Sequence, residues 1–260
     1  MLNLNKVGRP LCKIEKGKYN GMVVSVSTDH NGGGEGDELI REFKRLEIPN
    51  EAKFQQVADT TKERDILYIT GCSGSGKSTY TRKFIEQLKK VKKDIQVYLF
   101  SALNEDESLD SVEPKRIQLD ESLVDDPIDI KEFENSVVIF DDVDVIADKK
   151  IKEAVMKTMS LALEVGRHHK VNMVITNHLP TNGRDTRRIL NEASSFTYFP
   201  HSAKARIKYC LIEYVGIDKK MVTYFKKQNT RAVTIFKHYP MCYLCDHQVG
   251  LVSAYDDDED

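Results

Sequence analysis

The sequence predicts an α/β protein whose sheet is mostly parallel and carries helices on both faces. Two observations support this. Short apolar runs typical of buried strands alternate with longer segments whose apolar residues recur at helical spacing. Such alternation indicates parallel strands, because a crossover helix must connect each strand to the next. In addition, a glycine-rich segment, residues 71–79 (GCSGSGKST), lies between one such strand and one such helix.

The N-terminal region is expected to be a β-hairpin followed by a short helix. Residues 11–15 and 22–28 are rich in β-formers and flank a turn that contains Gly17 and Gly21. Residues 30–36 (HNGGGEG) are expected to be a connection, and residues 37–46 a short amphipathic helix.

The core then follows in order. The predicted strands are 65–70, 95–101, 136–141, 170–176 and 194–199. The predicted helices are 77–92, 148–165, 184–193 and 203–214. A helix at 218–228, a strand at 231–237 and a β-like segment to about residue 253 extend this core. The predicted organisation is an N-terminal region 1–60, a core 61–200, a C-terminal extension 201–255 and an acidic tail 256–260.

The glycine-rich segment fits the phosphate-binding pattern G-x-x-x-x-G-K-[ST], with a strand before it and a helix after it. Glycines let the backbone turn its N–H groups towards phosphate oxygens, and the helix N-terminus adds its dipole. Lys77 is expected to reach the β- and γ-phosphates, and the Ser78 hydroxyl to be a ligand of Mg²⁺. The predicted nucleotide-binding residues are Gly71, Cys72, Ser73, Gly74, Ser75, Gly76, Lys77, Ser78 and Thr79. The sequence therefore predicts binding of ATP with Mg²⁺.

Two carboxylates follow a second apolar run, VVIFDD, about 60 residues after the glycine-rich segment. The carboxyl end of a parallel strand is where α/β sheets place ligands. Asp141 is predicted to hold Mg²⁺, and Asp142 to orient or deprotonate the attacking water. Asp144 is an alternative for either role.

A third run, residues 171–176 (VNMVIT), ends in Asn177 and His178. A polar residue at this strand tip can contact the γ-phosphate or the attacking water, and we assign that sensor role to Asn177. His178 is the weaker candidate, because an isolated histidine is usually a satisfied loop residue.

Composition indicates a reducing compartment and no secretion. The five cysteines form no disulfide framework, and Cys72 lies within the glycine-rich segment. No apolar run is long enough to span a membrane. The net charge of −2 conceals an asymmetry, since residues 149–240 hold 18 Lys and Arg against 6 Asp and Glu. That excess is consistent with nucleic acid binding, and also with solvated helix faces.

Four segments together, GCSGSGKST, VVIFDDVD, EVGRHHKVNMVITNH and NGRDTRRILNEASSFTYFP, resemble the genome-packaging ATPases of large double-stranded DNA viruses. That group includes poxvirus, giant-virus and virophage enzymes within the FtsK–HerA class, and the resemblance covers roughly residues 64–240. It implies a RecA-like P-loop core, a pentameric or hexameric ring, and ATP-driven movement of double-stranded DNA into a capsid without sequence preference. It also implies docking at a capsid vertex, in the host cytoplasm, a viral factory or the virion. One departure is Asp142, where the wider class usually has Glu.

Other candidates carry two interpretations each. Arg187 and Arg188, and less strongly Arg167 and Arg184, are candidates for an arginine that reaches a neighbouring subunit's nucleotide, or for DNA contacts. Lys204, Arg206 and Lys208 are candidates for contacts with the DNA backbone. His238, Cys242, Cys245 and His247 form either a zinc site or a terminal hairpin. The alternative functions are a small-molecule or nucleotide kinase, and a nucleotide-bound scaffold for capsid assembly.

Overall fold

The computed structural model describes residues 1–28, 43–181, 183–202 and 206–253. The chain forms two compact units, which we name for their place in the sequence. The central unit is Lys62–Ala193, and the end unit combines Met1–Thr61 with Ser194–Asp260. Among the described residues, no helix is long and apolar enough to cross a membrane.

The central unit contains a parallel sheet with the strand order β6-β10-β9-β7-β8. Its strands are β6 (Ile66–Thr70), β10 (Asn172–Asn177), β9 (Val137–Asp141), β7 (Val97–Ser101) and β8 (Lys115–Arg116). Every residue of β6, β9 and β10 is buried. This burial explains the continuous apolar runs, because a parallel strand covered on both faces has no side that favours polar residues.

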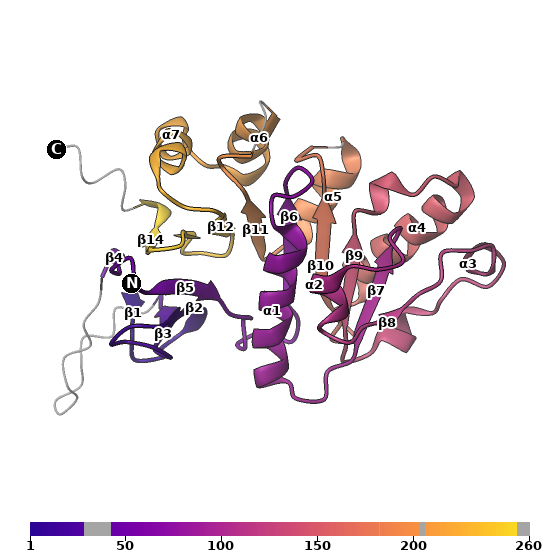
Figure 1. Cartoon of the computed structure of the whole chain (residues 1–260), viewed down its shortest axis with the longest axis horizontal. Coiled ribbons are helices and arrows are strands. Elements are labelled where there is room, and N and C mark those ends of the chain that lie inside the picture. Colours follow the sequence, from indigo (N-terminus) through magenta and orange to yellow (C-terminus); the bar gives the residue numbers. More distant parts are fainter. Residues whose placement is uncertain (29–42, 182, 203–205, 254–260) are drawn as a thin grey trace. The chain divides into compact units, whose positions relative to one another are not determined.

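Helices flank the strands of this unit (Figure 1). The longest are α1 (Lys77–Val91), α4 (Lys149–Val165) and α5 (Arg184–Glu192). Shorter ones are α2 (Glu107–Asp110), α3 (Ser122–Asp125) and the 3₁₀ turns η1 (Ile130–Phe133) and η2 (Val143–Val145). The predicted fold class is confirmed, with strands β6, β7, β9 and β10 and the three long helices within about two residues of their predicted bounds. Strand β8 was not predicted.

Register brings the polar tips of four strands to one level. Asn177 of β10 lies opposite Thr70 of β6, Thr176 lies opposite Asp141 of β9, and Asp141 lies opposite Ser101 of β7. Parallel pairing places the carboxyl ends of these strands at the same edge of the sheet, where the connections to the following helices begin.

The end unit is antiparallel and is built from both ends of the chain. One sheet has the order β1-β3-β2-β5 and comprises β1 (Leu2–Asn3), β3 (Val23–Val26), β2 (Arg9–Glu15) and β5 (Lys53–Gln56). The other strands follow the order β4-β14-β13-β12-β11, which are β4 (Arg45–Glu47), β14 (Gln248–Leu251), β13 (Cys242–Leu244), β12 (Val233–Phe236) and β11 (Ser195–Tyr198). The helices of this unit are α6 (Arg206–Tyr209), a π-helix η3 (Cys210–Val215) and α7 (Lys219–Lys227).

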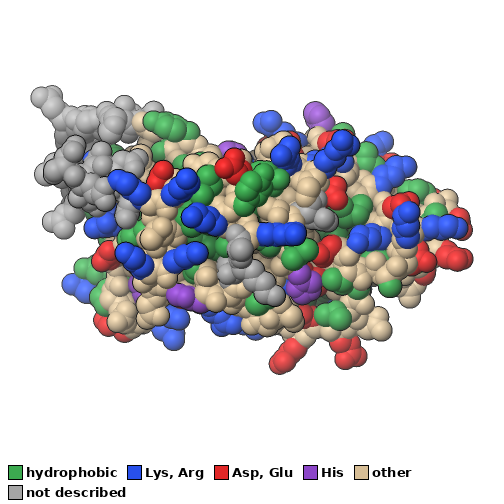
Figure 2. Space-filling view, turned by 90° about the horizontal axis from the view of Figure 1, so that it is seen from above, with side chains coloured by type: hydrophobic (Ala, Val, Ile, Leu, Met, Phe, Trp, Pro, Cys, Tyr) green, Lys and Arg blue, Asp and Glu red, His purple; other side chains and the backbone are tan. Residues whose placement is uncertain are grey.

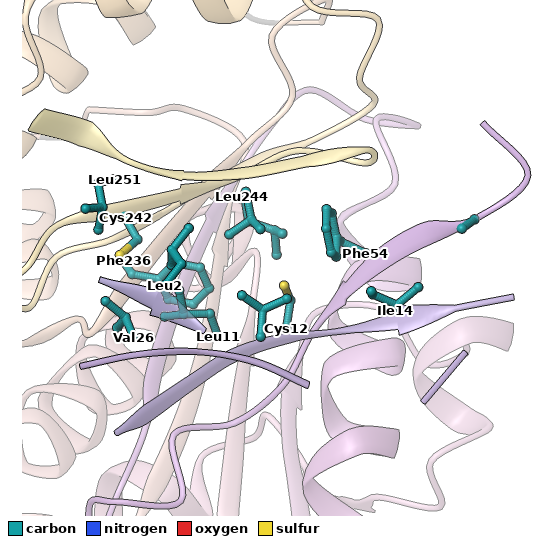
Figure 3. Packing of buried hydrophobic residues seen from close by; sticks show 13 residues of the cluster. Leu2, Leu11, Cys12, Ile14, Val26, Phe54, Phe236, Cys242, Leu244 and Leu251 are labelled. Atoms are coloured by element: carbon teal, nitrogen blue, oxygen red, sulfur yellow. The ribbon is translucent and has the colours of Figure 1, made fainter. Parts of the chain in front are cut away.

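A hydrophobic cluster joins these two layers of the end unit (Figure 3). The N-terminal layer contributes Leu2, Leu11 and Phe54, and the C-terminal layer contributes Phe236 and Leu244, among others. Residues almost 250 positions apart therefore share one core, so neither chain end can bury its apolar face without the other.

Several predictions for the end unit need correction. The hairpin is confirmed as β2 and β3, but β5 was not expected. The predicted helix 37–46 falls mostly outside the described residues, and its last part, Arg45 and Leu46, is in strand β4. Pairing with β14 decides that segment, because tertiary hydrogen bonds override a short amphipathic pattern. Residues 203–205 of the predicted helix 203–214 also lie outside the description, and from Cys210 the helix continues as a π-helix.

Candidate functional site

The glycine-rich loop connects β6 to α1 and adopts a conformation that depends on glycine. Gly74 and Gly76 have φ of 72° and 110°, in the left-handed region that other residues rarely adopt. Gly76 is also the N-cap of α1 and supplies no side-chain acceptor, whereas Asp148 caps the first N–H groups of α4. The first-turn amides of α1 are thus left for another acceptor, as a phosphate-binding helix requires.

Lys77, the first residue of α1, is buried and turned back towards the strand ends. Its Nζ lies 3.0 Å from the carbonyl oxygen of Gly71, 3.1 Å from Nδ1 of His178 and 3.2 Å from Oδ2 of Asp142. The loop itself is held to β10, because the amide of Gly71 donates to the carbonyl oxygen of Asn177. The predicted phosphate lysine therefore lies in direct contact with the residues that follow β9 and β10.

Asp141 ends β9 as a buried carboxylate supported by two hydroxyl groups. Thr176 Oγ1 donates to Oδ1 at 2.8 Å, and Ser101 Oγ donates to Oδ2 at 3.0 Å. Burial, reinforced by the neighbouring Asp142, raises the pKa of Asp141, while the two hydroxyl bonds oppose that rise. A bound cation would relieve this destabilisation of the ionised carboxylate.

The donor set here fits Mg²⁺ with nucleotide phosphates. Asp141 and Ser78 offer the oxygen ligands that Mg²⁺ prefers, and phosphates and water complete such sites. Ser75 Oγ, within the loop, is buried and has no hydrogen-bond partner among the described residues. A buried hydroxyl without a partner is uncommon and is consistent with a polar ligand at this loop.

Asp142 occupies a strained position immediately after β9. Its φ of 44° is in the left-handed region, where a non-glycine residue is unusual and where functional sites often store strain. Its amide donates to the carbonyl oxygen and the hydroxyl of Thr176, which holds this conformation. Its Oδ1 is buried and has no hydrogen-bond partner among the described residues. Asp144, the alternative carboxylate, lies in η2, and its backbone carbonyl accepts from Lys152.

The two candidates at the tip of β10 behave differently from the prediction. The Asn177 side chain is buried and donates to the hydroxyl of Tyr68 at 3.2 Å. His178 instead contacts both Lys77 and Asp142, with Nε2 3.2 Å from Oδ2 of Asp142. The sensor role of Asn177 thus stays a prediction, while His178 is the residue that reaches the loop lysine.

Ser101, Thr176 and Tyr68 were missed by sequence reasoning, although they shape the site. Ser101 and Thr176 hydrogen-bond Asp141, and Tyr68 holds Asn177. Ser101 and Thr176 are polar residues at the carboxyl ends of predicted strands, and that position was the available signal. Tyr68 carried none, because an aromatic residue within a buried strand is ordinary.

The candidate arginines are exposed in this chain. Arg184, Arg187 and Arg188 lie on α5, and Arg167 lies on the turn after α4. Arg188 forms an ion pair with Glu164 and donates to Ser160, both on α4. That ion pair must break before Arg188 can take the predicted role at a neighbouring subunit's nucleotide.

Of the three DNA-contact candidates, Arg206 and Lys208 are exposed on α6, and Lys204 lies outside the described residues. On the face drawn in Figure 2, Lys and Arg side chains are scattered among neutral and acidic ones. Sequence-independent contact with phosphates tolerates such scatter, because it needs positive charge rather than a fixed pattern.

The His and Cys residues near the C-terminus lie in a hairpin. Strands β13 and β14 pair antiparallel, Cys242 and Cys245 are buried, and His247 Nδ1 lies 2.9 Å from the carbonyl oxygen of Ala52. Burial raises the pKa of both thiols to about 12. No group of three His, Cys, Asp or Glu side chains that could hold a metal occurs within the described part of the chain.

Comparison with known proteins supports these observations to different extents. The family model described as Nephrocystin 3, N-terminal, matches residues 46–113, which include the glycine-rich loop but less than half of the chain. The type VII secretion ATPase EccC of Thermomonospora curvata is 11% identical, with a TM-score of 0.51 over 78% of this chain and 28% of that one. At that identity the likeness shows the fold alone, which is that of P-loop NTPases.

Two further comparisons concern viruses. The genome packaging NTPase of Sulfolobus turreted icosahedral virus 2, solved in complex with AMPPCP, is 12% identical with a TM-score of 0.46, over 74% of this chain and 95% of that one. The uncharacterized protein V3 of Sputnik virophage is 35% identical over 243 residues, which are 92% of this chain and 94% of that protein. Identity at this level over nearly the whole length confirms the virophage resemblance predicted from the motifs, and this chain belongs to the family of Sputnik virophage protein V3.

Proposed function

We propose that this chain is an ATPase that moves double-stranded viral DNA into a capsid. The observation that carries the proposal is the convergence of Lys77, Asp141 and Asp142 beside the uncapped start of α1. Lys77 and the loop amides bind the phosphates of ATP, and Asp142 orients or deprotonates the attacking water. Asp141 and Ser78 would hold Mg²⁺, and the ion would neutralise charge on the phosphates.

The DNA part of the proposal rests on family and charge. The chain belongs to a virophage protein family, and the excess of Lys and Arg in residues 149–240 suits contact with a phosphate backbone. The working form is a ring of five or six subunits at a capsid vertex, in the host cytoplasm, the viral factory or the virion. Arg187 or Arg188 of one subunit then stabilises charge on the nucleotide of the next.

Steady-state ATPase measurements with and without double-stranded DNA test the proposal. We expect turnover of ATP with Mg²⁺, and equal stimulation by two DNA duplexes of unrelated sequence. Lys77→Ala should lower turnover by about 10²-fold or more, because it removes the charged donor at the phosphates. Lys90→Ala, an exposed lysine on the same helix, is the matched control and should retain full turnover.

The contrary outcomes separate the alternatives. Phosphate transfer to a small acceptor in place of water would identify a kinase. Tight nucleotide binding without turnover would identify a nucleotide-bound scaffold. Turnover that DNA leaves unchanged would contradict the motor. Light scattering with a non-hydrolysable ATP analogue tests the ring.

A further inference from the structure

A closed set of contacts joins Lys77, His178 and Asp142, which come from three different segments of the central unit. His178 bridges the other two, with Nδ1 3.1 Å from Nζ of Lys77 and Nε2 3.2 Å from Oδ2 of Asp142. Nζ of Lys77 also lies 3.2 Å from the same Oδ2. His178 is the only member with substantial exposure, at 33% of its side chain, against 7% and 17% for the others.

The chemistry of these groups determines which ring nitrogen of His178 carries the proton. A lysine ammonium can only donate, so the Nδ1 that faces it must accept and is unprotonated. In the neutral ring the proton is then on Nε2, which lies 3.2 Å from Oδ2 of Asp142. His178 therefore places its N–H group beside one carboxylate oxygen of Asp142, much as a second residue orients a catalytic base elsewhere.

The Lys77 ammonium has three close partners in this arrangement. It donates to the carbonyl oxygen of Gly71 and to Nδ1 of His178, and it forms an ion pair with Oδ2 of Asp142. A phosphate oxygen can be bound only if one of these contacts is released. Release of the contact with His178 leaves no charge unpaired, because Nδ1 is neutral, and the ring is partly exposed to solvent. Release of Asp142 would instead separate two opposite charges.

The two carboxylate oxygens of Asp142 differ in the contacts that they make. Oδ2 faces Lys77 and His178, whereas Oδ1 is buried and has no hydrogen-bond partner among the described residues. If His178 retains Oδ2 after Lys77 turns to a phosphate, Oδ1 is the oxygen left to accept from water. Asn177, the neighbouring residue, is held by Tyr68 and does not share this role.

We propose that His178 is a positioning residue, which orients the Asp142 carboxylate and exchanges its contact with Lys77 when a phosphate enters the loop. The inference rests on the proposed ATPase function. Phosphate binding in the loop and the orientation of the Asp142 carboxylate are thereby coupled through the His178 side chain. His178→Ala removes the link, while His178→Gln keeps a donor near the position of Nε2 and restores the hold on Asp142.

The test measures kcat and nucleotide affinity for His178→Ala and His178→Gln, with His168→Ala as the control. His168 is exposed on the turn before β10, at the opposite end of that strand. For His178→Ala we expect kcat to fall about 10-fold, a typical loss when an orienting partner is removed. Affinity for a fluorescent ATP analogue should hold or improve, because Lys77 has lost a competing acceptor. His178→Gln should recover most of kcat, and His168→Ala should match the wild type.

A double-mutant cycle distinguishes a positioning role of His178 from a merely structural one. If His178 acts through Asp142, then His178→Ala adds little loss of kcat once Asp142→Asn is present. Additive losses, or unchanged kcat in His178→Ala, overturn the inference provided that Lys77→Ala abolishes wild-type turnover. Wild-type turnover that is absent, or that survives Lys77→Ala, overturns the proposed function instead.

Discussion

The central unit and the end unit differ in how their buried polar side chains are hydrogen-bonded. In the end unit such groups pair with one another, as the Thr197 and Thr234 hydroxyls do at 2.7 Å and Gln56 with Ser195 at 3.0 Å. In the central unit they gather at the carboxyl ends of parallel strands, and several buried oxygen atoms have no hydrogen-bond partner among the described residues. These include Thr70 Oγ1, Ser75 Oγ and Asp142 Oδ1. In the end unit, the Tyr198 hydroxyl also lacks a hydrogen-bond partner among the described residues.

This difference indicates which unit contributes mainly to folding stability and which unit keeps polar groups available for a ligand. In the end unit, antiparallel strands from both chain ends satisfy each other's hydrogen-bonding groups and so add to the stability of the fold. Parallel strands that end at one edge hold polar groups ready for a ligand, and that arrangement costs stability until the ligand binds. Substitutions in the end unit should therefore affect unfolding, and substitutions at the strand tips should affect turnover.

The largest effect should come from the core of the end unit. Leu11 is fully buried in the shared cluster, so Leu11→Ala should lower the free energy of unfolding by about 2–5 kcal/mol. Turnover per folded molecule should hardly change. Denaturant unfolding and ATPase assays measure the two quantities, and Val7→Ala, at a residue 43% exposed in the same unit, is the control. Loss of turnover in Leu11→Ala molecules that remain folded would contradict the expectation that substitutions in the end unit affect unfolding alone.

Asp142→Asn is the reciprocal experiment in the central unit. The amide keeps the shape of the side chain and removes the base, so turnover should fall about 10²-fold while nucleotide binding persists. The melting temperature should stay close to that of the wild type. If Asp142→Asn instead weakened nucleotide binding and altered the Mg²⁺ dependence of the residual turnover, the roles of Asp141 and Asp142 would be reversed.

Thiol accessibility gives a chemical comparison of the units. Cys12, Cys210, Cys242 and Cys245 are buried in the end unit, and burial raises the pKa of each thiol, to about 12 for the last three. Cys72 lies partly exposed in the nucleotide loop. Iodoacetamide at neutral pH should modify Cys72 first, and ATP should slow that reaction, as peptide mass spectrometry can measure. Equally rapid modification of Cys245 would contradict the compact end unit.

Asp141→Asn should show the stability cost of the site. Burial raises the carboxyl pKa, so ionisation destabilises the fold at pH values above the carboxyl's usual range. The variant should melt at a higher temperature than the wild type at pH 7, and this gain should shrink as the pH falls towards 4. Thermal melts without nucleotide at several pH values measure it. A lower melting temperature at pH 7 would show that the Ser101 and Thr176 bonds outweigh burial.

The smallest effect is expected on α6 of the end unit. Replacing Arg206 and Lys208 together with Ala should reduce the salt dependence of DNA binding by about two units of log–log slope per chain, if each contacts one phosphate. Basal ATPase activity should stay the same, since neither residue belongs to the central unit. An unchanged slope would assign the DNA contacts to other residues.

The sequence by itself determined most of the central unit. Strands β6 and β9 are largely continuous apolar runs, because both of their faces are buried, and the loop motif indicates its residues through the chemistry of phosphate binding. Lys77, Asp141 and Asp142 could therefore be predicted as site residues before the fold was known.

Tertiary structure alone decided the rest. Strand register placed Ser101 and Thr176 against Asp141. Side-chain direction brought Asn177 into contact with Tyr68, and His178 into contact with Lys77. In the end unit, β4 became a strand because β14 offers it hydrogen bonds from the other end of the chain. Local patterns report burial and turn chemistry, but contacts between distant residues depend on register and on side-chain direction, which no local pattern encodes.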